Sequence, residues 1–129
     1  MTAPGASLAP VLLVLLGGAI GAPARYLLDR AVQSRHDSAF PWGTLCVNVI
    51  GSLILGVLAG AATAHDSALW TLLGTGFCGA LTTFSTFGYE TVRLFEDRAR
   101  LYAVVNVVVT VVAGVGAAAV GFTLGHLLA

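Results

Sequence analysis

The chain consists of four long apolar stretches separated by three short polar ones. The apolar stretches run over about 8–28, 42–63, 69–89 and 102–128. Each is close to the length of about 20 residues that an α-helix needs to cross a bilayer. The polar stretches are 30–40, 64–67 and 91–100. This pattern predicts an all-α membrane protein, a single domain over 1–129 with four transmembrane helices.

Composition supports a membrane location. Hydrophobic residues make up 57% of the chain and charged residues only 9%, whereas a typical soluble domain has about 25% charged residues. The formal net charge is zero, so we expect no surface for nucleic acid. Cys46 and Cys78 lie in apolar stretches without a nearby histidine, and we interpret them as packing residues.

The basic residues are unevenly distributed. All six lie in or beside the first and third polar stretches, which a four-helix topology places on the same side: Arg25, Arg30, Arg35, Arg93, Arg98 and Arg100. The opposite side, with both termini and 64–67, has no Lys or Arg. Cytoplasmic loops carry an excess of these residues. We therefore expect loops 30–40 and 91–100 in the cytoplasm and both termini outside, in a plasma-membrane protein.

The third apolar stretch is the least regular. Its sequence GFCGALTTFSTFGY, from Gly76 to Tyr89, mixes glycine, hydroxyl and aromatic residues. Irregular backbone is tolerated in lipid only where it is buried in protein or lines a water-filled cavity. We therefore predict a break at 79–82. Carbonyls freed there can coordinate a small cation, and the start of the following half-helix favours an anion.

Two other predicted helices carry polar residues at helical spacing. Those of each helix share one face: Thr44, Asn48 and Ser52 in the second helix, and Tyr102, Asn106 and Thr110 in the fourth. Interhelical hydrogen bonds, worth about 0.6 kcal/mol on average, account for a single Ser or Thr in such a place. Two such tracks beside a broken helix favour a polar pathway.

The residues of this pathway suit an anion. No Asp or Glu lies deep in an apolar stretch, although a cation or proton path usually needs one. Phe84 and Phe87 share a face, and the edge of an aromatic ring is positive. Core or lipid packing explains such a pair as well, but its interleaving with Ser85 and threonines favours a pore wall. Arg25 either attracts anions to an entrance or is a snorkelling anchor.

These motifs resemble the Fluc (CrcB-type) fluoride channels along nearly the whole chain. The matching stretches are GGAIGAPARY (17–26), FPWGTLCVNVIGSLILG (40–56), GFCGALTTFSTFGYE (76–90) and the Tyr102/Asn106/Thr110 track. The resemblance implies passive, selective export of cytoplasmic fluoride, which relieves fluoride toxicity. It also implies an antiparallel, dual-topology-type dimer of four-helix subunits with two pores in the bilayer.

The resemblance further implies roles for single residues. Phe84 and Phe87 would contact fluoride through their ring edges, Asn48 would donate a hydrogen bond, and Tyr102, Asn106 and Thr110 would continue the path. The family often has Ser at the last two positions. Thr44, Ser85 and Arg25 would lie along or beside the pore, Arg25 in its vestibule. A structural Na⁺ ion, not transported, would be held by the main-chain carbonyls of Gly79 and Thr82.

The arginine bias departs from the simplest picture of the family, because homodimeric members insert in both orientations with nearly balanced charge. We hypothesise that this chain has a fixed orientation and pairs with a second homologous subunit of opposite orientation. Two other functions stay open. A small four-helix multidrug or cation exporter would use a glutamate in the first helix, which is missing here. A non-transporting assembly subunit would need neither polar tracks nor a break. We expect no enzyme, because no catalytic cluster is visible at membrane depth.

Overall fold

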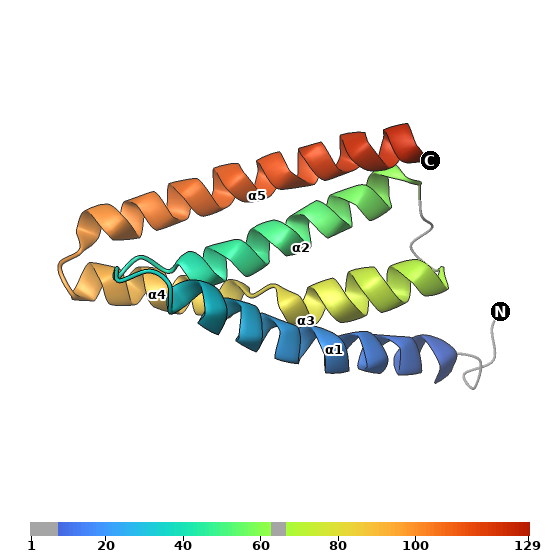
Figure 1. Cartoon of the computed structure of the whole chain (residues 1–129), viewed down its shortest axis with the longest axis horizontal. Coiled ribbons are helices and arrows are strands. Elements are labelled where there is room, and N and C mark those ends of the chain that lie inside the picture. Colours follow the sequence, from blue (N-terminus) through green and yellow to red (C-terminus); the bar gives the residue numbers. More distant parts are fainter. Residues whose placement is uncertain (1–7, 63–66) are drawn as a thin grey trace.

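The computed structural model describes residues 8–62 and 67–129, which form a bundle of helices (Figure 1). Two continuous helices come first, and a third segment follows in pieces before a last long helix. The elements are α1 (Leu8–Gln33), α2 (Trp42–Gly60), the π-helical η2 (Trp70–Cys78), α3 (Gly79–Leu81), α4 (Phe84–Glu96) and α5 (Arg100–Leu128). Within the described residues this confirms the all-helical prediction. α1, α2 and α5 are each long and apolar enough to cross a membrane, as a multi-pass membrane protein requires.

Several helix ends differ from the predicted ones, because the polar stretches also become helical. α1 continues to Gln33, α4 continues to Glu96 and α5 begins at Arg100. Arginine, glutamine and glutamate are good helix formers. These helices therefore extend past the apolar stretches from which they were predicted. The second helix ends at Gly60 and not at residue 63 as predicted, because a turn follows at Ala61 and Ala62. Most of the predicted 64–67 connection lies outside the described residues.

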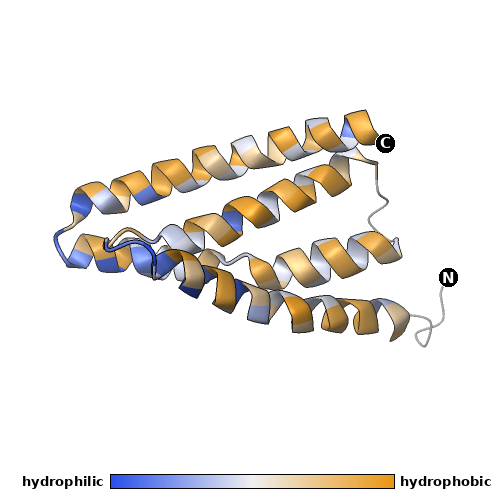
Figure 2. Ribbon diagram, viewed as in Figure 1, coloured by the Kyte–Doolittle hydropathy of each residue, from blue (hydrophilic) through white to orange (hydrophobic). Residues whose placement is uncertain are grey.

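The two connections that follow α1 and α4 lie at the same end of the bundle, and the start of α1 and the end of α5 lie at the other (Figure 1). Hydrophilic residues gather at the end with the two connections, while the rest of the long helices is mostly hydrophobic (Figure 2). The prediction that both arginine-bearing stretches share one side of the bundle is therefore confirmed. We call this side the arginine end.

Glycines bring α2 and α5 into main-chain contact. A Cβ atom added at Gly56 would collide with the carbonyl oxygen of Ala118, and one added at Gly121 would collide with that of Leu53. The same reciprocal contacts recur one turn further along both helices. Helix association in lipid depends on such close packing of small residues, because the surrounding lipid is as apolar as the helix faces.

The third segment changes its neighbour along its length. η2 and α3 pack mainly on α1, whereas α4 packs mainly on α5. Gly17 and Gly21 make the first contact possible, because a Cβ atom at either position would collide with the main chain of η2. Leu81 ends α3 with a side chain that is 0% exposed. The break between α3 and α4 is thus the point at which the segment leaves α1 and joins α5.

We predict that Gly121→Ala lowers the free energy of unfolding by about 1–3 kcal/mol, the usual penalty for overpacking. Thermal unfolding in detergent micelles measures this loss. Gly116→Ala is the matched control on the same helix, because a Cβ atom there meets nothing within 4 Å. The control should be neutral, or more stable by up to about 1 kcal/mol through helix propensity. Equal stability of the two variants would contradict the packing described here.

Candidate functional site

The third segment is interrupted at Thr82 and Thr83. Both residues are extended, with φ/ψ of −82°/160° and −151°/122°. The break predicted at 79–82 was therefore placed too early, since Gly79 is helical, with φ/ψ of −60°/−37°. Helical structure continues through Leu81, whose burial holds the chain against its neighbours. The N–H of Thr82 still donates to the carbonyl of Cys78 over 3.0 Å, so the helical pattern is lost only after this residue.

The side chain of Asn48, from α2, takes over the hydrogen bonds that the break would leave open. Its Nδ2 donates to the carbonyl of Thr83 over 3.0 Å, and its Oδ1 accepts from the N–H of Thr83 over 2.7 Å. In a continuous helix the N–H of Thr83 would donate to the carbonyl of Gly79 instead. The Gly79 carbonyl is thus deprived of its usual donor. An amide nitrogen carries two protons, so one N–H of Asn48 remains for another partner.

Thr83 also begins α4. Its buried hydroxyl oxygen accepts from the N–H of Thr86 over 3.1 Å and donates its proton to the Thr86 hydroxyl over 3.0 Å. This is an N-cap, which satisfies one of the free N–H groups of the first helical turn. Ser85 lies in this turn with an exposed side chain, 3.4 Å from the Thr83 hydroxyl. The partially positive start of α4 is therefore fixed at the break.

A cavity of about 330 Å³ lies beside the break. It brings together four of the predicted pore residues, namely Asn48, Phe84, Phe87 and Thr110, and it is also lined by Ser52, Leu55, Thr82, Thr83 and Val111. The two phenylalanine rings are 5.8 Å apart between centroids and tilted by 53°. Phe84 is 82% exposed on the surface of the subunit. The cavity thus combines amide and hydroxyl groups with two aromatic rings.

Arg25 and Thr44 line a second cavity, of about 230 Å³, together with Asp29 and two residues of the break region, Thr83 and Thr86. Thr83 is common to both cavities. A third and wider cavity of about 560 Å³ opens toward the arginine end and shares Asp29 with the second. Polar cavities therefore follow one another from the arginine end to the break.

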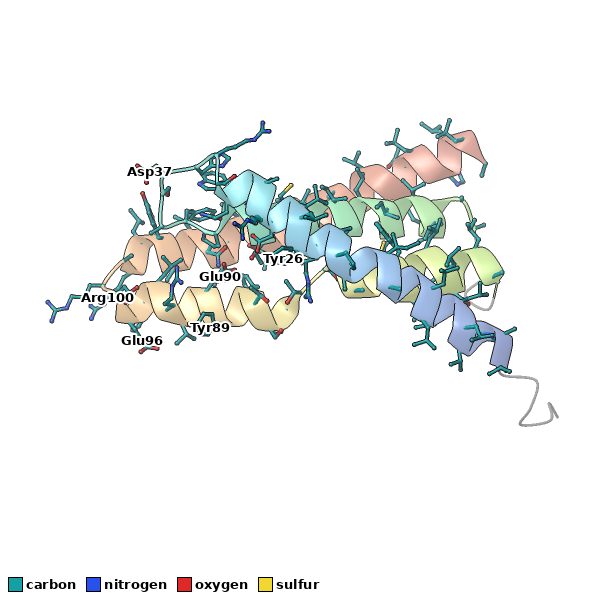
Figure 3. The ribbon with its side chains drawn as sticks, turned by 60° about the horizontal axis from the view of Figure 1, so that its bottom comes forward. Tyr26, Asp37, Tyr89, Glu90, Glu96 and Arg100 are labelled. Carbon is teal, nitrogen blue, oxygen red and sulfur yellow. The ribbon has the colours of Figure 1, made fainter. Side chains whose placement is uncertain are left out.

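Glu90 brings an acidic group into this region. It lines the widest cavity together with Tyr26, and the two residues lie near each other in Figure 3. Glu96 and Arg100 project at the end of the bundle in the same view. Among the described residues, Thr44 Oγ1 and Glu90 Oε1 are buried without a hydrogen-bond partner. Glu90 thus brings a half-buried carboxyl group to the wall of the widest cavity.

The three residues of the predicted polar track on α5 lie in three different environments. Thr110 lines the cavity beside the break. Asn106 is 1% exposed and donates from Nδ2 to the hydroxyl oxygen of Thr91, in α4, over 2.9 Å. Tyr102 packs edge-on against Phe40, with ring centroids 6.1 Å apart, and lines a cavity of about 220 Å³ at the arginine end. Of the three, only Thr110 lines the cavity that contains the phenylalanines.

Two residues have roles in the site that the sequence pattern did not predict. Thr83 joins both cavities, and its place before a helical run is a typical N-cap signal. Thr91 bonds to Asn106, but it falls in a stretch that was interpreted as a loop. Its spacing of four from Phe87 and seven from Phe84 places all three on one face of a helix. Helical periodicity continued past Tyr89 would have found it.

We predict that Asn48→Leu strongly destabilises the subunit, because it leaves the N–H and the carbonyl of Thr83 unpaired. An unpaired buried polar group costs about 1–3 kcal/mol. Thermal unfolding in detergent should show this loss. Ser52→Ala, one turn along α2 in the same cavity, is the control and should unfold close to the wild type. A mild effect of Asn48→Leu, equal to that of the control, would refute the anchoring role.

The chain is similar to known proteins over most of its length. Residues 12–122 match the family model described as "CrcB-like protein, Camphor Resistance (CrcB)". A relative from Frankia casuarinae, named fluoride-specific ion channel FluC 1, is 58% identical over 89% of this chain and 95% of its own length. A relative of the same name from Streptomyces avermitilis is 57% identical over 91% and 96%. A Mycobacterium tuberculosis relative, named fluoride-specific ion channel FluC 2, is 53% identical over 84% of both chains. These matches confirm the resemblance seen in the sequence: the chain belongs to the CrcB (Fluc) family.

Proposed function

We propose that this protein is a fluoride-selective channel, not an enzyme, which lets cytoplasmic fluoride leave the cell passively and so relieves its toxicity. One observation carries the proposal. The cavity beside the break gathers the Asn48 amide, the Phe84 and Phe87 rings and the Thr110 hydroxyl at the start of a helix. Relatives 57–58% identical to this chain are named as fluoride-specific ion channels.

The chemistry of the cavity suits a small anion. Fluoride is strongly hydrated, so a pore must replace its water with close donors. Asn48 has one N–H left after binding Thr83, the first turn of α4 offers a positive helix end, and ring edges add weak positive charge. A narrow path with such groups fits fluoride better than a larger halide.

The direction of transport follows from the membrane potential. Fluoride enters a cell as the neutral acid, dissociates at cytoplasmic pH and is trapped as the anion. A potential that is negative inside drives an anion outward, by about 2.3 kcal/mol per 100 mV for each charge. Arg25 and the other arginines at one end raise the local concentration of anions at that entrance. Export therefore needs no further energy source.

The exposed face of the broken segment supports an antiparallel dimer. Phe84 is 82% exposed although it lines the cavity, and a Cβ atom added at Gly79 or Gly88 would meet nothing within 4 Å. A second subunit laid against this face closes the cavity on its open side. Two subunits paired in this way enclose two paths.

A structural Na⁺ ion fits the break. The Gly79 carbonyl is deprived of the N–H of Thr83, which binds Asn48 instead, and Thr82 is extended. Unwound carbonyls and the ends of half-helices are the groups that coordinate Na⁺ in broken membrane helices. We assign the main-chain oxygens of Gly79 and Thr82 to this ion, which would tie two subunits together without being transported.

The arginine end is proposed to face the cytoplasm, with both termini outside, because cytoplasmic loops are rich in arginine. Five of the six basic residues belong to this end, and Arg25 lies further inside α1 beside the second cavity. An antiparallel partner must place its corresponding end outside, which the charge of this chain disfavours. The proposed partner is therefore a second homologous subunit with the opposite orientation.

Fluoride efflux from liposomes tests the function. We expect rapid efflux of fluoride and none of chloride, and Phe84→Ile or Phe87→Ile should slow it by about tenfold or more, the effect of about 1.4 kcal/mol on the barrier. Phe122→Ile, an exposed phenylalanine of α5 that does not line the cavity, is the control and should leave efflux unchanged. Equal efflux of chloride, or no fluoride efflux with any homologous partner, would refute the proposal.

Reporter fusions test the orientation. Alkaline phosphatase joined after Ala129 should be active, because it folds only outside the cytoplasm, and green fluorescent protein at the same place should stay dark. Removing Arg98 and Arg100 should weaken this preference, since positive charge sets the orientation. Activity of both reporters at similar levels would show insertion in both orientations and would remove the need for a second kind of subunit.

A further inference from the structure

Three hydrogen bonds in series join α5 to α4 next to the cavity. Thr110 Oγ1 lies 3.3 Å from Asn106 Oδ1, Asn106 Nδ2 lies 2.9 Å from Thr91 Oγ1, and Thr91 Oγ1 lies 2.8 Å from the carbonyl oxygen of Phe87. The two end members, Thr110 and Phe87, line the cavity, whereas Asn106 and Thr91 do not. The series thus connects two lining residues of the cavity, one on α4 and one on α5, through residues outside it.

The direction of every bond in this series is fixed by the carbonyl of Phe87. A carbonyl only accepts, so Thr91 must give it the single proton of its hydroxyl. The Thr91 oxygen then accepts from Asn106, which turns the NH₂ group of that amide toward α4 and its Oδ1 toward Thr110. Oδ1 also only accepts. The proton of Thr110 is therefore directed at Asn106 and away from the cavity.

This direction matters for an anion. While Thr110 donates to Asn106, its hydroxyl presents only lone pairs to the cavity and cannot donate to fluoride. The Thr110–Asn106 bond is the longest of the three, at 3.3 Å. Rotation of the Thr110 hydroxyl proton can exchange this bond for one that points into the cavity. The other two bonds hold the segment from Phe87 to Thr91 against α5.

Direct contact between Asn106 and a permeating ion does not fit the structure. The side chain is 1% exposed, and both of its polar atoms already have partners on α4 and α5. A role in packing alone does not fit either, because burying an amide is unfavourable unless its hydrogen bonds are made. A leucine would fill a similar volume without that requirement.

We infer that Asn106 is a positioning residue of the conduction path. It holds Phe87 in place through Thr91 and sets the direction of the Thr110 hydroxyl, without touching the ion. This inference rests on the proposed fluoride conduction.

A double-mutant cycle tests the inference. Thr91→Val and Asn106→Leu both remove the hydrogen bond between these two residues, with little change in volume, and each also removes one further bond of the series. Each should slow fluoride efflux by about tenfold, as a rise of about 1.4 kcal/mol in the barrier does. The double variant should be slowed by clearly less than the product of the two single effects, because the shared bond is lost only once. Thr91→Ser keeps the hydroxyl and should restore efflux close to the wild-type rate.

Two results would overturn the inference. Thr91→Val with wild-type efflux, beside a slow Asn106→Leu, would mean that Asn106 acts on the ion itself. If the double variant slows fluoride efflux by the product of the two single effects, the two residues act independently. If Asn106→Leu does not fold, Asn106→Ala replaces it in the cycle, because alanine has no group that can donate to Thr91 and should give the same loss.

A spectroscopic measurement separates this inference from the proposed function. The side-chain NH₂ signals of Asn106, recorded by NMR in detergent, should move in Thr91→Val and stay in place in Thr91→Ser. Unmoved signals in Thr91→Val would refute the bond, whatever the flux. Absence of fluoride efflux from the wild type, with the expected shift present, would refute only the proposed function.

Discussion

The arrangement of the whole site depends on the two hydrogen bonds between the Asn48 amide and the main chain of Thr83. An unpaired backbone group costs several kcal/mol in the bilayer, where no water can replace a lost partner. A transmembrane helix can therefore be interrupted only where another group takes over its hydrogen bonds. Asn48 does so for Thr83, and the start of α4, its N-cap and the change of neighbour from α1 to α5 all follow from the interruption at this residue.

The same amide also links structure to chemistry. Its bonds to Thr83 fix its orientation, and this leaves one N–H with a defined direction beside the phenylalanine rings. On α5, Asn106 has the complementary role. It is bonded at both ends and lies outside the cavity, so it orients other groups instead of offering its own. Two asparagines on neighbouring helices thus serve one cavity in different ways.

The sequence predicts the helical class, the break in the third segment and the importance of Asn48, because apolar length and polar spacing are local properties. The position of the break is not local. It depends on a side chain 35 residues away, and the threonines at the break permit several positions equally well. Thr91 was missed because the hydrophobic signal ends before the helix does. For Asn106, the spacing gives the correct face of α5 but not the neighbour on that face, which only the packing of α4 determines.

The glycine contacts between α2 and α5 and between α1 and η2 have a consequence for the size of the path. Where side chains separate two helices, a change of rotamer can adjust the distance between them. Main chains in direct contact have no such freedom. The distance between the helices that carry Asn48 and Thr110 is therefore set by rigid backbone. A path whose width cannot adjust is suited to discriminating between ions that differ mainly in radius.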